Sequence, residues 1–193
     1  FALQFVGNDE VVLSNPGAQR RTFPGFGLVQ SGNFNYGNHE TASRISGDGR
    51  FAAGTNNAAI KWNGAQWMQV GPGAGITYRG IYPEDVSMAW SCTMGGGIWA
   101  WHLQPDIIER NGSNGDLLRL WGTSRNNLFA VGATGQLLRR NTSGMWDPIV
   151  TGSNSTLGGM WGPDSSEAWI VGSGGTILHW DGSKQLVSPE ALM

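Results

Sequence analysis

The chain has 193 residues, a net charge of −2 at pH 7, 31 Gly, 10 Trp and only 13% charged residues. The weak charge provides no basic surface that would bind nucleic acid. No apolar run approaches the roughly 20 residues that span a bilayer. The single Cys excludes an internal disulfide and a multi-thiolate zinc site. Its Trp, Phe and Tyr side chains can form a large apolar core, so we expect a globular chain rather than a disordered one.

The chain repeats itself. An offset of 40 residues aligns Trp121 with Trp161 and Phe129 with Trp169, and an offset of 79 aligns Trp90 with Trp169. Two further offsets, of 39 and then 47 residues, extend the alignment back towards the N-terminus. Self-similarity at a fixed period is typical of repeat architectures. The copies span about 1–42, 43–77, 78–116, 117–156 and 157–193.

The first copy is the most divergent. Val6 takes the place of Val171, so this copy begins at the second strand of the repeat, and we expect its first strand to be absent. Residues 24–42 lengthen the spacing and are rich in Asn, Gly and aromatic residues, which is typical of a loop.

The 24–42 loop provides the candidate ligand-binding residues. Aromatic rings can pack on the apolar face of a sugar, while amide and imidazole groups bind its hydroxyls, and loops on a rigid scaffold often carry such sites. The alternative is a cover loop whose aromatic side chains pack over a sheet edge. The predicted ligand-binding residues are Phe34, Asn35, Tyr36 and His39.

The later copies predict short strands joined by tight turns. In the fourth copy the apolar runs are bounded by Gly, Asn and Ser, which indicates strands and hairpins. Residues 103–111 come nearest to a helix, but Pro105 favours an extended strand and a turn. The strands expected in the fourth copy are 118–121, 127–131, 135–140 and 146–150.

Four short antiparallel strands per period of about 40 residues match a blade of a β-propeller. We therefore expect an all-β fold, with residues 1–193 as a single propeller domain of four-stranded antiparallel blades. A ring of five blades is the first expectation, and part of a six- or seven-bladed ring is the alternative.

Large apolar side chains at equivalent positions are expected to pack blade against blade. Pockets between blades are the alternative where Trp is replaced, as at Arg140. The residues expected in the packing are Trp62, Tyr82, Trp90, Trp101, Trp121, Phe129, Trp161, Trp169 and Trp180.

The polar residues show no catalytic or metal-binding spacing. Asp85 and Asp164 share one turn position and are expected to bond local backbone amides. Cys92 aligns with Val171 and is expected to be buried. Gly95 belongs to the same repeated turn as the 172–175 glycines, so a phosphate-binding loop is not indicated. We predict no catalytic residue, no metal site and no cofactor.

The sequence of the repeat resembles a bacterial repeat with the pattern V-W-G-x-x-x-x-D-V-W-A-V-G-x-x-G-T-I-L-H-W-D-G. Here it reads Met-Trp-Gly at 160–162 and Trp-Ile-Val-Gly-Ser-Gly-Gly-Thr-Ile-Leu-His-Trp-Asp-Gly at 169–182. The resemblance is strong over 118–184, moderate over 43–104 and faint over 1–24. It implies a propeller that is secreted, periplasmic or at the cell surface, and it implies little about chemistry.

Three functions are compatible with this sequence. The first is a non-enzymatic, lectin-like or protein-binding module that recognises a glycan or a protein through its propeller loops. The second is a structural or accessory subunit in a hetero- or homo-assembly, and the third is a glycosidase-like hydrolase, which would need convergent carboxylates. Nucleic acid is not an expected partner, and the chain is not expected to span a membrane.

Overall fold

The computed structural model describes part of the chain. It gives the backbone of the strands at 2–6, 10–14, 18–22, 27–32, 42–45, 51–54, 59–62, 67–69 and 186–187, and the side chains of Lys61 and Met68. Backbone and side chains are described for 76–85, 88–101, 107–110, 112, 115–164 and 166–182. Among these residues no helix combines the length and apolar character that crossing a bilayer requires.

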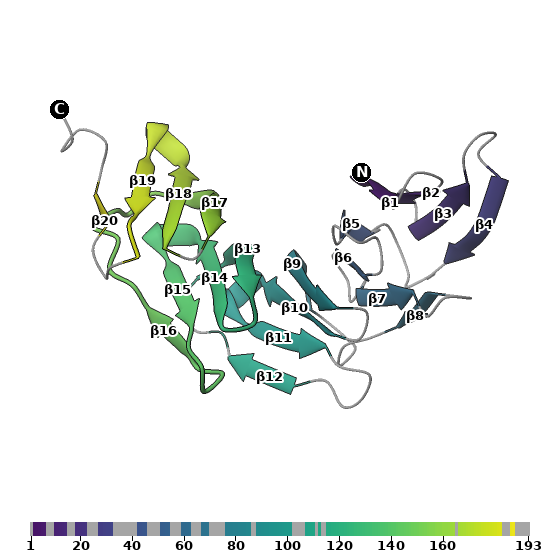
Figure 1. Ribbon diagram of the computed structural model, residues 1–193, viewed down its shortest axis with the longest axis horizontal. Helices are drawn as coiled ribbons and strands as arrows, with labels where there is room; N and C mark the ends of the chain where they lie inside the picture. The colour runs from purple at the N-terminus through teal and green to yellow at the C-terminus, as the bar shows by residue number, and fades with distance from the viewer. Residues whose placement is uncertain are drawn as a thin grey trace. The chain divides into compact units, whose positions relative to one another are not determined.

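The described strands form five four-stranded sheets, each built from strands consecutive in the chain (Figure 1). The pairing is antiparallel, as expected from the short runs and tight turns. The first two sheets contain β1 Ala2–Val6, β2 Glu10–Ser14, β3 Ala18–Thr22, β4 Gly27–Gly32, β5 Ala42–Ile45, β6 Phe51–Gly54, β7 Ala59–Trp62 and β8 Trp67–Gln69.

The remaining three sheets follow the same order. The third contains β9 Tyr78–Asp85, β10 Met88–Thr93, β11 Ile98–Trp101 and β12 Ile107–Arg110. The fourth contains β13 Leu117–Ser124, β14 Asn127–Gly132, β15 Leu137–Arg140 and β16 Trp146–Pro148. The fifth contains β17 Leu157–Asp164, β18 Glu167–Gly172, β19 Ile177–Trp180 and β20 Leu186–Val187.

The predicted all-β fold of four-stranded antiparallel sheets is therefore confirmed, and the four strands expected in the fourth copy are all present. The strand expected within 103–111 is confirmed at β12. One expectation about the first copy is wrong, because residues 27–32, expected in a loop, form β4 and pair with β3. The first sheet accordingly has four strands rather than three.

A short 3₁₀ turn joins the second and third strands in each of the last three sheets. These turns are η1 Met94–Gly96, η2 Ala133–Gly135 and η3 Ser173–Gly175. Their middle residues lie in the left-handed region, with φ of 76° at Gly95, 53° at Thr134 and 66° at Gly174. Gly adopts this conformation without steric cost, whereas Thr adopts it only at a steric cost. The glycines predicted to make a repeated turn do so.

The chain divides into two compact units. The first comprises Phe1–Ser91 with Trp99–Ile107, and the second comprises Cys92–Ile98 with Ile108–Met193.

In the first unit, the described core surrounds Tyr78, Ala89 and Trp101. The rings of Tyr78 and Trp101 meet edge to face, with centroids 5.3 Å apart. Trp90 is fully buried, and Tyr82 packs beside it. The Ser91 hydroxyl, also buried, donates to the Gly80 carbonyl at 2.9 Å. Burial of Trp90 and Trp101 agrees with the predicted packing role.

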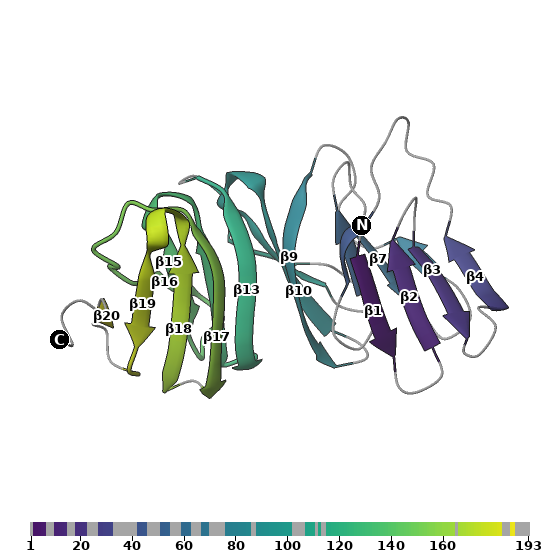
Figure 2. The same ribbon diagram turned by 90° about the horizontal axis from the view of Figure 1, so that it is seen from above.

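In the second unit, the fourth and fifth sheets pack face to face. Their first strands, β13 and β17, lie side by side (Figure 2). The Phe129 and Trp180 rings are in edge contact, with centroids 5.6 Å apart, and the Arg139 guanidinium lies over both rings. Trp121 is partly buried against this core, and Cys92 is fully buried, as predicted. The buried cluster consists of Phe129, Val131, Leu137, Leu157, Ala168, Ile170, Leu178 and Trp180.

Two residues expected in this packing are exposed instead. Trp161 is 67% exposed and Trp169 is 38% exposed. In β18, buried Ala168 and Ile170 alternate with exposed residues, as in a strand covered on one face only. The repeat places an indole at both exposed positions, but no described neighbour covers that face of the fifth sheet.

Candidate functional site

The residues predicted to bind a ligand lie outside the described residues. Phe34, Asn35, Tyr36 and His39 all fall within 33–41, after the end of β4. Their role stays a prediction. The Trp62 side chain also lies outside the described residues.

The described candidate site is a ridge at the end of β16, formed by Pro148, Ile149 and Val150. It separates two pockets, of about 490 Å³ and about 460 Å³, and all three residues contribute to both pockets. Val150 is 84% exposed. An apolar centre with a polar surround is the usual composition of a protein-recognition surface.

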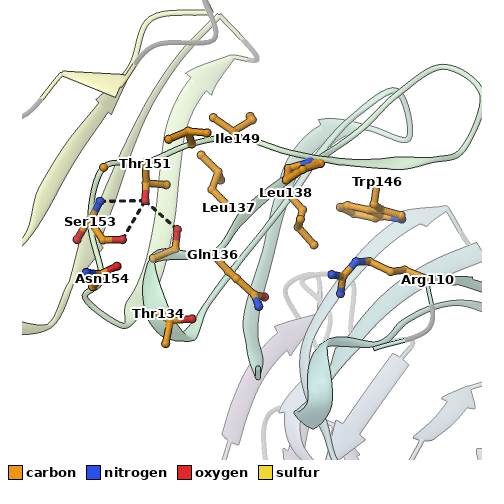
Figure 3. Close-up of a pocket in the computed structure, with 14 residues that line it drawn as sticks. Arg110, Thr134, Gln136, Leu137, Leu138, Trp146, Ile149, Thr151, Ser153 and Asn154 are labelled. Carbon is orange, nitrogen blue, oxygen red and sulfur yellow. Dashed lines mark hydrogen bonds between the residues drawn. The ribbon is translucent and has the colours of Figure 1, made fainter. Parts of the chain in front are cut away.

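Strand β15, strand β16 and the segment that follows them form the first pocket (Figure 3). Leu138 and Trp146 provide its apolar wall, and Arg110 extends from β12 toward Trp146 (Figure 3). The Arg110 guanidinium also donates to the carbonyl of Gly96 in the η1 turn.

Hydrogen bonds hold the polar wall of this pocket against the η2 turn. The Thr151 hydroxyl donates to the Gly135 carbonyl at 2.9 Å, and it accepts from the Ser153 amide at 3.2 Å (Figure 3). The Gly135 amide donates to the Ser155 carbonyl at 2.7 Å. A Cβ added at Gly135 would lie 1.7 Å from the Ser153 carbonyl oxygen, so this close approach requires Gly.

Gln136 lines the same pocket and has an unsatisfied side chain. Both its amide nitrogen and its amide oxygen are buried, and neither has a hydrogen-bond partner among the described residues. The equivalent Thr176 of the fifth sheet, in contrast, donates to Ser155 or to the Ser173 carbonyl. A buried unpaired amide is destabilising, so Gln136 is a departure from the repeat that packing does not account for.

The second pocket lies on the other side of the ridge, with Trp180 and Arg139 in its wall. Arg139 is held by its two aromatic neighbours and by a hydrogen bond to Asn127 at 3.3 Å. At the pocket rim, the Asn141 amide donates to the Asp147 carboxylate at 3.0 Å. The rim therefore offers guanidinium, amide and carboxylate groups around the apolar ridge.

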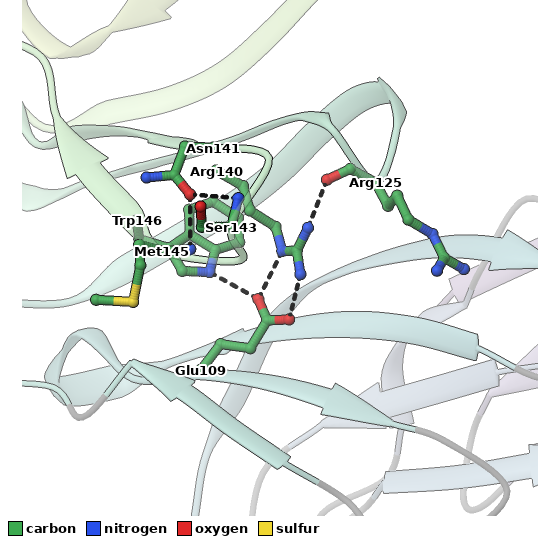
Figure 4. Close-up of polar contacts among 7 residues, drawn as sticks. All are labelled: Glu109, Arg125, Arg140, Asn141, Ser143, Met145 and Trp146. Atoms are coloured by element: carbon green, nitrogen blue, oxygen red, sulfur yellow. Dashed lines mark hydrogen bonds and ion pairs between the residues drawn. The ribbon is translucent and has the colours of Figure 1, made fainter.

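An ion pair lies beside Trp146, at the start of β16 (Figure 4). The Glu109 carboxylate accepts two hydrogen bonds from Arg140, at 2.7 and 2.8 Å, and a third from the Trp146 indole at 2.9 Å. The third guanidinium nitrogen, Nη1, donates to the carbonyl of Arg125 at 2.9 Å. The Arg140 and Glu109 side chains are 11% and 10% exposed. This bidentate pair joins β12, β15 and β16.

A tight turn joins β15 to β16 beside the ion pair. The Asn141 side-chain oxygen accepts from the backbone amides of Ser143 and Met145, both at 3.0 Å (Figure 4). Asn side chains commonly hold turns in this way. Met145 thereby sits in the turn that leads into β16.

The described carboxylates of this unit are engaged in structural contacts. Besides Glu109, the Asp164 carboxylate accepts from the amide and hydroxyl of Ser166 at 2.7 and 2.6 Å, which confirms its predicted turn role. These bonds, led by the hydroxyl, hold the pKa of Asp164 below its ordinary value. Among the described residues no group of three His, Cys, Asp or Glu side chains is arranged to hold a metal ion.

Arg140 departs from the repeat, but no local sequence pattern indicates its partner. Glu109 belongs to the preceding copy, 31 residues earlier, and no local pattern connects the two. The ridge carried a weak signal, because Ile149 and Val150 extend the apolar run past Pro148.

No protein-family model matches the chain, and no curated protein matches it. Solved structures do. The WD40 repeats of RRP9 match with a TM-score of 0.68 and 11% identity, over 94% of this chain and 61% of that one. The extracellular domain of BT4673 from B. thetaiotaomicron matches with a TM-score of 0.66 and 17% identity, over 97% of this chain and 27% of that domain. This chain thus spans about three fifths and about a quarter of these two chains.

These likenesses show a propeller-type fold. At such low identities they carry the fold and no activity.

Proposed function

We propose that this chain is a non-enzymatic binding module that recognises a protein partner at the ridge of Pro148, Ile149 and Val150. The observation that carries the proposal is the exposure of Val150 between two pockets of similar volume. An extended segment laid across the ridge could place a side chain in each pocket. The Glu109–Arg140 pair and the Asn141 turn support a preformed surface, which lowers the entropic cost of binding.

The propeller itself is part of the proposal. The five sheets are its successive blades, either as a ring of five or as part of a six- or seven-bladed ring. The resemblance to a bacterial export-associated repeat, together with the extracellular domain of BT4673 among similar structures, supports a secreted, periplasmic or cell-surface location.

A peptide-display experiment tests the binding site. A library of random linear peptides is selected on the immobilised chain, and the selected peptides are then measured against Val150→Asp and Thr123→Asp. Thr123 is exposed in the same unit and lines neither pocket, so it is the matched control. We expect Val150→Asp to weaken binding at least about 10-fold and Thr123→Asp to leave it unchanged.

If the selected peptides bind the two variants with equal affinity, the ridge is not their binding site. A glycan array is the second arm, because the predicted loop site would bind a sugar instead. Glycan binding that is lost in Tyr36→Ala and kept in Val150→Asp would locate recognition at Phe34, Asn35, Tyr36 and His39.

A further inference from the structure

The fifth sheet has an apolar face that is open to solvent. We define this face, the open face, by Trp161, Trp169, Val171 and Ile177, which are 67%, 38%, 50% and 44% exposed. They come from all three strands β17, β18 and β19. Contiguous exposed apolar side chains on one sheet are typical of an interaction surface.

The repeat supplies an internal reference for this face. One copy earlier, the residues equivalent to Trp169, Val171 and Ile177 are fully buried in the core shared by the fourth and fifth sheets. They are Phe129, Val131 and Leu137. The same positions are therefore covered in one sheet and uncovered in the next.

The fifth sheet provides the surface that covers the Phe129 side of the fourth sheet. Ala168, Ile170 and Leu178 of the fifth sheet contact the Phe129 side of the fourth sheet, and Trp180 completes the cover. Each sheet of this type thus has a covered face and a covering face. The open face needs a covering face from another sheet of the same kind.

The open face also repeats the polar details of the covered one. Where Arg139 lies over Phe129, His179 stacks on Trp169, with ring centroids 4.4 Å apart. The Glu167 carboxylate lies 3.5 Å from the His179 ring nitrogen, in the position that Asn127 has relative to Arg139. An aromatic side chain like Trp180 could therefore pack against Trp169 and His179 as Trp180 packs against Phe129 and Arg139.

The first sheet carries a matching pattern. An offset of 165 residues aligns Leu3, Phe5 and Leu13 with Ala168, Ile170 and Leu178. In the β1–β2 register, Leu3 pairs with Leu13 and Phe5 with Val11, so these four positions belong to one face of the first sheet.

We infer that the open face of the fifth sheet docks onto the first sheet of a second copy of this chain, in a head-to-tail contact. A second copy supplies the missing covering face, and because the two contacting faces differ, the contact is heterologous.

Analytical ultracentrifugation across a wide range of protein concentration tests this inference. We expect dimers and larger species to increase with concentration, together with a blue shift of Trp fluorescence as Trp161 becomes buried. Val171→Asp should abolish association while the far-ultraviolet circular dichroism stays unchanged, because Val171 is half exposed in the isolated chain.

Complementation makes the test specific. Phe5→Asp alters the first sheet and Val171→Asp alters the fifth, so each variant should be monomeric. Mixed together, each retains the face that the other has lost, and we expect a heterodimer that does not grow further. Three results would overturn the inference: a monomer at every concentration, a Val171→Asp chain that associates like the wild type, or Trp burial that is independent of concentration. The last would mean that the chain covers its own open face. None of these results depends on the ridge.

Discussion

The Glu109–Arg140 pair allows the most detailed prediction of stability. Both side chains are nearly buried, and Glu109 accepts hydrogen bonds from Arg140 and Trp146. Removing one member of a buried pair leaves the other charge unpaired, which typically costs about 3–5 kcal/mol. Glu109→Leu and Arg140→Leu should therefore each lower the free energy of unfolding by about 3–5 kcal/mol.

The double variant should be far less destabilised than the sum of the two. It removes both charges together, and the remaining losses are the hydrogen bonds to Trp146 and to the Arg125 carbonyl, about 1–3 kcal/mol in total. Urea unfolding of the four chains gives the coupling energy, which we expect to be several kcal/mol. If the loss of unfolding free energy in the double variant equals the sum of the two single losses to within about 0.5 kcal/mol, Glu109 and Arg140 are not energetically coupled.

Three further predictions concern the repeated turns. Gly135→Ala should destabilise more than Gly174→Ala, because both have positive φ but only the Gly135 site would place a Cβ 1.7 Å from a carbonyl oxygen; equal losses in urea unfolding would contradict this. Thr134→Gly should raise the melting temperature slightly, since the relief of a left-handed Thr outweighs the added entropy of the unfolded chain; a lower melting temperature would count against strain there. The pKa of Asp164 is below its ordinary value of 3.8, so its contribution to stability is present at neutral pH and is lost as the pH falls through the lowered pKa. Acid titration of Asp164→Asn should therefore show a smaller loss of stability than wild type, and identical acid profiles would argue against the Ser166 contacts.

The strands and turns could be predicted because their signals are local. The apolar run of β14 and the glycines of η3 carry their conformational preference within a few residues, and the repeat made each copy a check on the others. Segment 27–32 was missed because its Gly and Ser content resembles a loop, while its pairing with β3 decides its conformation.

Solvent exposure could not be read from the repeat. Trp169 and Phe129 occupy the same position, yet within the described part of the chain only Phe129 has a neighbouring sheet over it. A sequence pattern specifies which face of a strand is apolar, but the coverage of that face depends on another element. The Glu109–Arg140 pair was missed for the same reason, because its members come from different sheets.

The most direct test of this fold is whether the fourth and fifth sheets pack face to face. Nuclear Overhauser effects between the Phe129 ring and the Trp180 indole measure this, since the two rings belong to different sheets and their centroids are 5.6 Å apart. We predict strong cross-peaks between these rings in the folded chain. Cross-peaks confined to residues within each sheet would contradict successive sheets stacked through the Phe129 and Trp180 side chains.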